Sequence, residues 1–255
     1  MISRRIMALG LAAAAPSILR ISKALGQDDE AKAESFVQLI YPPLEALSQP
    51  ENFGYLEPDQ AQKDKVDRII NETPKGPTPL AIARSFIDRF ATSDPGAISQ
   101  WPAPDSWNPL IVRFFQSTSM NVANDMVAWC AAFANWCIER NNKTGTRSAS
   151  SQSFVDPRNA KYFPRTNDPQ QGDLAVWTCY DAQSGNSLNL GHVAFVSDKP
   201  SGNSVLTISG NTSRDNHYSI IAEKPFATKD REVYRTVNGA RVPTVMKLNA
   251  YLKIA

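Results

Sequence analysis

Apolar residues recur at helical spacing between residues 125 and 142, in the stretch DMVAWCAAFANWCIERNN. One broad face collects Met126, Trp129, Phe133 and Trp136, with Cys130, Ala134 and Cys137 as a neighbouring stripe. This pattern is typical of a buried amphipathic helix. Asn124 or Asp125 can cap its start, and Glu139 and Arg140 make its end polar. We therefore expect a helix that places Cys130 in its first turn or two.

Further helical patterns precede this one. Helix-like stretches occupy residues 29–49, 58–72, 80–92 and 109–118. Pro58 and Asp59 are start signals for the second of them. The stretch TPKGPTP, residues 73–79, predicts a linker, because its prolines and glycine do not continue a helix.

The character of the chain changes after residue 150. Short β-rich runs separated by Gly, Asn, Ser and Pro occupy residues 173–180, 192–198, 204–210 and 232–237. Helices followed by a small antiparallel sheet indicate an α+β fold.

The runs 192–198 and 204–210 are joined by the hairpin loop KPSGNS. If Ser201 and Gly202 form a two-residue turn, His192 lies opposite Asn211, and directly opposed Cβ atoms are about 5 Å apart. A turn at Gly202 and Asn203 instead pairs Asn211 with Ala194, so the register is a hypothesis.

The N-terminus has the anatomy of an export signal. Arg4 and Arg5 precede an apolar run that Pro16 interrupts, and an acidic segment follows. We expect cleavage near Gly26, and SRRIM resembles the twin-arginine class, although the general secretory route stays open. The run is shorter than the ~18 residues of a membrane span. We therefore expect a periplasmic or secreted protein without stable membrane insertion after signal removal.

Charge then excludes one class of function. Cleavage after residue 26 removes four basic residues and no acidic one, so 27 minus 4, or 23, basic residues face 25 acidic ones, and the net charge moves from +2 to −2. Nucleic-acid binding needs a clustered basic surface. We therefore expect no nucleic-acid partner.

The three cysteines differ in whether they can form a disulfide or act as a nucleophile. Seven residues of helix separate Cys130 from Cys137 by roughly 10 Å, which is too far for a disulfide. A thiol at a helix start is favoured as thiolate, so Cys130 is the better nucleophile candidate, although most free cysteines are core residues. In an oxidising compartment Cys137 and Cys179 can pair, or all three thiols can be free.

Only two histidines can serve as a catalytic base. His192 heads a strand, whereas His217 lies in the polar loop SRDNHYS, where we expect solvent exposure. Cys130, His192 and Asn211 follow the chain order of a nucleophile, a base and an orienting group. A structural strand histidine and a plain turn asparagine are the alternatives.

The motifs WCAAFANWC, GHVAFV and SGN, with NPLIVRFF upstream and QQGDLAVW between them, resemble the CHAP group within the NlpC-type papain-like cysteine peptidases and amidases. The resemblance spans roughly residues 78–255. It divides the chain into a signal peptide at 1–26, a helical accessory segment and linker at 27–77, and a CHAP-like domain at 78–255.

The resemblance implies a papain-like α+β fold in which a helix carrying the cysteine packs on a small antiparallel sheet. It implies cleavage of amide bonds in peptidoglycan stem peptides or cross-bridges, without a metal or other cofactor. Cys130 takes the nucleophile position, His192 the base and Asn211 the polar third position. The family often has an acidic residue near that third position, where Ser209 and Asn211 stand here. An inactive envelope scaffold, a secreted wall-degrading effector and an enzyme acting on protein remain alternatives.

Overall fold

The structure is a computed structural model, and it describes residues 56–100, 106–214, 218–237 and 240–255. The α-helices are α3 (Gln60–Glu72), α4 (Pro79–Phe90), α5 (Pro109–Phe114) and α6 (Cys130–Arg140). Short 3-10 helices are η2 (Pro95–Ile98), η3 (Phe115–Ser117), η4 (Ser151–Val155) and η5 (Pro157–Asn159). The strands are β1 (Arg165–Thr166), β2 (Leu174–Asp181), β3 (Ser187–Val196), β4 (Ser204–Arg214), β5 (Tyr218–Ala227), β6 (Arg231–Val237) and β7 (Ala240–Leu252).

Helix α3 begins after the predicted start signal Asp59, whereas α4 begins at Pro79, one residue inside the predicted linker. Asp59 caps α3 through a reciprocal capping box with Gln62. Thr78 caps α4 by accepting a hydrogen bond from the Ala81 N–H, with Pro79 at the first helical position. These side chains satisfy N–H groups that a helix start leaves without a partner. The local sequence therefore sets both helix starts.

The start of α6 differs from the prediction. The helix begins at Cys130, and its N-cap is Trp129, whose side chain makes no capping hydrogen bond. Asn124 instead accepts from the Met126 N–H, and the Asp125 carboxylate accepts from the Asn108 N–H. The predicted caps were wrong because both side chains fix the irregular segment before the helix. Cys130 thereby becomes the first helical residue.

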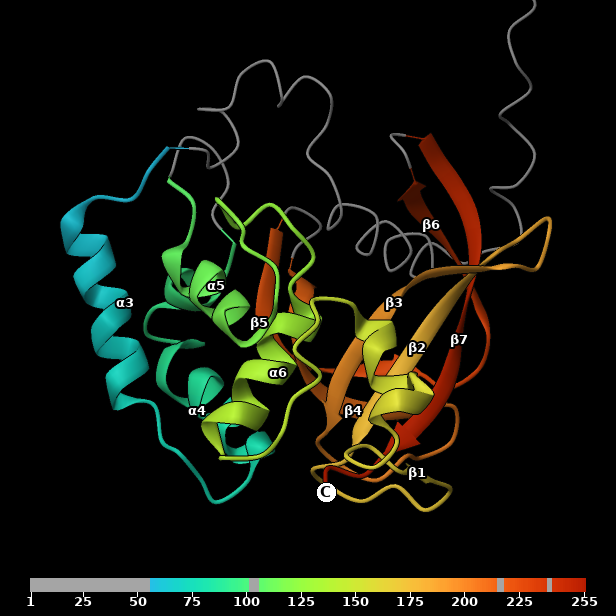
Figure 1. The fold of residues 1–255 in the computed structure, drawn as a ribbon. Coiled ribbons are helices and arrows are strands. Elements are labelled where there is room, and N and C mark those ends of the chain that lie inside the picture. Colours follow the sequence, from blue (N-terminus) through green and yellow to red (C-terminus); the bar gives the residue numbers. More distant parts are fainter. Residues whose placement is uncertain (1–55, 101–105, 215–217, 238–239) are drawn as a thin grey trace, which may run out of the picture.

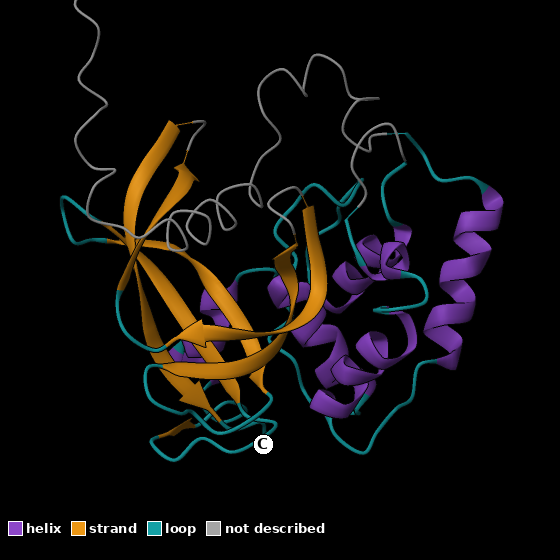
Figure 2. Cartoon of the chain, turned by 180° about the vertical axis from the view of Figure 1, so that it is seen from behind, coloured by secondary structure: helices purple, strands orange, loops and turns teal. Residues whose placement is uncertain are grey.

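The strands form one antiparallel sheet in the order β1-β7-β2-β3-β4-β5, with β6 pairing with β7. Figure 1 shows the α-helices on one side of the molecule and the sheet on the other, with β5 reaching behind α6. Figure 2 shows the same division from behind. The α+β prediction is confirmed. The sequence analysis did not predict strands β1, β5 and β7.

The sheet buries both of its faces. Leu174 and Val176 of β2 pack with α6 in the larger core, whereas Ala175, Trp177 and Cys179 pack in a second apolar cluster. Alternate residues of a strand point to opposite faces, so the second cluster lies on the face turned away from the helices. Burial on both faces explains why this strand is apolar at consecutive positions.

The β3–β4 hairpin combines the predicted register with the alternative turn. Phe195 pairs with Ile208 and Val196 with Thr207, which is the register predicted from a turn at Ser201 and Gly202. However, Ser201 pairs with Ser204, so Gly202 and Asn203 form the turn. The two registers coexist because the N–H groups of Ser197 and Asp198 both point to the Leu206 carbonyl, a local bulge that absorbs the difference.

All three cysteines are free and buried. Cys137 belongs to the larger core, and Cys179 belongs to the cluster on the other face of the sheet. The Cys137–Cys179 disulfide considered from the sequence is therefore absent, because the sheet separates the two thiols.

The described part of the predicted accessory segment joins the main core. Val66 and Ile69 of α3 are buried in the same cluster as α4, α5 and α6, and Arg140 of α6 donates to the carbonyls of Ile70 and Thr73. The domain boundary at residue 77 stays a prediction. The predicted signal peptide and His217 lie outside the described residues. Within the described ranges, no helix combines the length and apolarity needed to cross a bilayer.

Candidate active site

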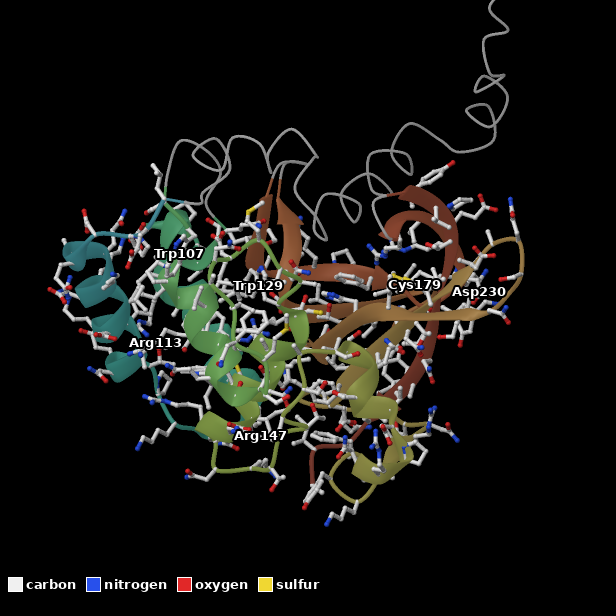
Figure 3. The ribbon with its side chains drawn as sticks, turned by 45° about the horizontal axis from the view of Figure 1, so that its top comes forward. Trp107, Arg113, Trp129, Arg147, Cys179 and Asp230 are labelled. Atoms are coloured by element: carbon white, nitrogen blue, oxygen red, sulfur yellow. The ribbon has the colours of Figure 1, made fainter. Side chains whose placement is uncertain are left out.

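Cys130 stands where α6 meets the sheet. It is the first residue of the helix, with 5% of its surface exposed. The side chain before it, Trp129, packs between the helices and the strands (Figure 3). Since Trp129 provides no capping oxygen, the first N–H groups of α6 keep their capacity to donate. A helix start of this kind favours negative charge on a thiol or on an oxyanion.

The pKa of the Cys130 thiol is nevertheless raised. Burial raises it, and the backbone N–H groups of Val193 and Ala131 and the charge of Arg235 oppose that effect without cancelling it. The N–H of Val193 reaches the thiol from β3. Val193 directly follows His192 in the chain, so the fold brings the thiol to the strand that carries the predicted base.

His192 is buried on β3, with 2% of its surface exposed. It pairs with Trp177 of β2, and its ring stacks on Phe226 with centroids 4.9 Å apart and an interplanar angle of 6°. Its Nε2 lies 2.9 Å from Ser209 Oγ. The preceding residue must be glycine, because a Cβ on Gly191 would lie 1.9 Å from the Trp177 carbonyl oxygen. Close strand packing thus fixes the backbone of His192.

The pKa of His192 is lowered to about 3, because burial disfavours the charged imidazolium and the nearby Arg235 and Arg231 add repulsion. The pKa of the Cys130 thiol is raised as well, so both shifts favour a neutral thiol and a neutral imidazole at pH 7. The sequence analysis expected a thiolate held against a protonated His192. The directions of both pKa shifts oppose that ionisation state, because both groups are desolvated in a packed core.

Ser209 and Asn211 are the two candidates for the third position. Ser209 Oγ bonds His192 Nε2 and also lies 2.7 Å from Thr212 Oγ1. Asn211 is buried, and its backbone has a φ of 57° in the left-handed region, which asparagine tolerates well. Gly210 and Asn211 both fall opposite Ile221, forming a bulge in β4. Ser209 therefore supplies a hydrogen bond that can orient the imidazole.

Sequence reasoning missed Arg235, a charged residue with only 3% of its surface exposed. Its Nε lies 3.3 Å from Cys179 Sγ, and its Nη2 lies 3.6 Å from Met246 Sδ. Its charge acts on both Cys130 and His192. A signal was present, since Arg235 is two residues from the buried Val233 and strand alternation places both on the face of the second apolar cluster.

The described part of the chain contains no group of three or more His, Cys, Asp or Glu side chains arranged to hold a metal ion.

Comparison with protein families completes the description of this site. Residues 122–211 match the family model of the CHAP domain. The CHAP segment contains Cys130, His192, Ser209 and Asn211, and it ends at Asn211. CHAP domains are generally cysteine- and histidine-dependent amidases or peptidases, so the match indicates a peptidoglycan-related hydrolase. No curated protein and no solved structure matched the chain.

Proposed function

We propose that this protein is an exported cysteine hydrolase that cleaves amide bonds of peptidoglycan stem peptides or cross-bridges, with a papain-like arrangement of helix and sheet. The observation that carries the proposal is the position of Cys130. It opens α6 inside the CHAP segment, and the N–H of the residue after His192 acts on its thiol. The helix that carries the thiol thus meets the strand that carries the base position, although the two are distant in sequence, and the imidazole itself packs with Trp177 and Phe226.

The proposed reaction starts from the neutral pair. His192 Nε2 and Ser209 Oγ are hydrogen-bonded, and the reaction uses the tautomer in which Nε2–H donates to Oγ, which leaves the basic lone pair on Nδ1. His192 Nδ1 takes the thiol proton as Cys130 Sγ bonds to the amide carbonyl carbon. The carbonyl π electrons move to oxygen, and N–H groups at the start of α6 stabilise that oxyanion.

Collapse of the oxyanion breaks the C–N bond, and the imidazolium gives its proton to the leaving amine. His192 next takes a proton from water, whose oxygen attacks the thioester carbonyl. The C–S bond breaks, the peptide leaves as a carboxylic acid, and the Cys130 thiol is restored. Arg235 favours the negatively charged states of this cycle, because its guanidinium acts on Cys130 through the packed core.

The test is digestion of purified peptidoglycan, with mass spectrometry of the released fragments. The wild-type protein should release peptides or new amino groups. Cys130→Ala and His192→Ala should each lose most of the activity, because nucleophile and base act as one unit. Cys137→Ala is the matched control, since this second buried thiol lies on the same helix. Undiminished hydrolysis by a folded Cys130→Ala protein would refute the proposal.

A second candidate function is a non-catalytic envelope module of the same fold. The burial of Cys130 and His192 favours it, since pKa values shifted toward the neutral forms oppose nucleophile activation. The same digestion separates the two functions, because a scaffold releases no fragments in any variant.

Export is tested separately. Replacing both Arg4 and Arg5 with lysine should leave the precursor in the cytoplasm if the twin-arginine route is used. Normal export of that variant would favour the general secretory route.

A further inference from the structure

The segment that leads into Cys130 has no regular structure of its own. Residues 121–129 contain no helix or strand, so side-chain contacts rather than a backbone ladder must fix their position. Two of these contacts come from parts of the chain distant in sequence. Gln100 follows η2, and Ser219 lies in β5.

Gln100 and Ser219 form a closed set of hydrogen bonds. The Gln100 N–H donates to the Ser219 carbonyl at 2.7 Å, and Ser219 Oγ lies 3.3 Å from Gln100 Oε1. The Gln100 amide then donates from Nε2 to the carbonyl of Asp125 at 3.0 Å. Gln100 thus connects β5 directly to the segment before Cys130.

Ser219 also holds the residue that precedes the nucleophile. Trp129 Nε1 donates to Ser219 Oγ at 2.8 Å, and both side chains are fully buried. The indole packs so closely on β4 that a Cβ on Gly210 would lie 2.3 Å from its Cζ3. The hydrogen bond to Ser219 and the packing against Gly210 therefore fix the position of the Trp129 indole. Its backbone carries Cys130.

We propose that Gln100 and Ser219 are positioning residues for Cys130, which hold Trp129 and Asp125 so that α6 begins with its thiol against β3. This inference rests on the proposed function for its catalytic consequence. Its structural consequence is independent of substrate. Loss of the Ser219 hydroxyl removes the indole hydrogen bond and frees the first turn of α6, while the remainder of that helix keeps its own anchors.

Asn135 provides a matched control on the same helix. It is fully buried, and its Nδ2 donates to Thr146 Oγ1 and to the Ser148 carbonyl. Its Oδ1 accepts from the Thr146 N–H. Asn135→Ala therefore removes buried hydrogen bonds from α6 without touching the anchor of Trp129.

The experiment measures labelling of individual cysteines by iodoacetamide in the full-length protein at pH 8, read by peptide mass spectrometry. Ser219→Ala should raise the labelling rate of Cys130 about tenfold relative to Cys137, which corresponds to the loss of one buried hydrogen bond. Gln100→Ala should act in the same direction. Ser219→Thr keeps the hydroxyl and should restore the wild-type ratio to within threefold. Asn135→Ala should leave the ratio unchanged.

Hydrolysis of peptidoglycan by the same variants gives the second measurement. Ser219→Ala should lower kcat about tenfold with KM within twofold of wild type, so the thiol becomes more accessible and yet less active. If all three cysteines of Ser219→Ala label faster together, the residue serves global stability only, and the proposal is overturned. If the wild-type protein hydrolyses no peptidoglycan, the proposed function fails, while the labelling ratio still decides the positioning role.

Discussion

His192 should make the fold sensitive to acid. Its pKa is about 3 in the folded protein, because the imidazole is buried and faces the charges of Arg235 and Arg231, against 6.5 for the ordinary side chain. Between these two pH values the unfolded chain binds a proton that the folded protein does not. The free energy of unfolding should therefore fall as the pH drops from 6.5 toward 3, by about 1.4 kcal/mol per pH unit.

The accumulated loss from this one residue is roughly 4 kcal/mol at pH 3 and about 2 kcal/mol at pH 5. The perturbation is His192→Gln, whose amide can still bond Ser209 but does not titrate. Urea unfolding followed by circular dichroism at pH 7 and pH 5 gives the two free energies for each protein. Wild type should lose about 2 kcal/mol more than His192→Gln over this interval.

Both proteins have the same carboxylates, so the carboxylate contribution to the free energy of unfolding cancels when wild type is compared with His192→Gln. His217→Gln is the control, since the sequence places that histidine in a polar loop, and it should keep the wild-type slope. Equal losses in wild type and His192→Gln would refute the assignment of His192 as a buried neutral imidazole. They would also remove the argument for a neutral resting pair.

Three further outcomes follow from the same core. Because burial raises the pKa of Cys130, its alkylation at pH 7 should be slower than that of a free thiol and should still increase above pH 9; a plateau below pH 8 would contradict this. Ser209→Ala should lower kcat on peptidoglycan more than Asn211→Ala, since Ser209 bonds the imidazole, and the reverse order would transfer the orienting role to Asn211. Gly210→Ala should destabilise the fold by about 1–3 kcal/mol in urea unfolding, because its Cβ would overlap a buried indole; a change under 0.5 kcal/mol would show that the packing yields there.

Local signals sufficed where the physics is local. Asp59 predicted the start of α3 through capping, which involves only residues a few positions apart, and α4 begins within one residue of the predicted start, at a proline assigned to the linker. The same capping rules gave the wrong start for α6. Asp125 carries the side chain of a capping residue, but the folded protein uses its carboxylate to bond the backbone of Asn108, seventeen residues earlier.

The sequence by itself determined the α+β class, helical stretches that match the four α-helices of the described residues, and the choice of Cys130 and His192 as candidates, because apolar periodicity and residue chemistry can be read from the local sequence. Only the tertiary structure decided the ionisation of that pair and the groups that hold it. Burial sets both pKa values, and burial is a property of packed neighbours. Ser209, Arg235 and Ser219 reach the site from strands that pair across the sheet, so their roles exist only once distant segments are in contact.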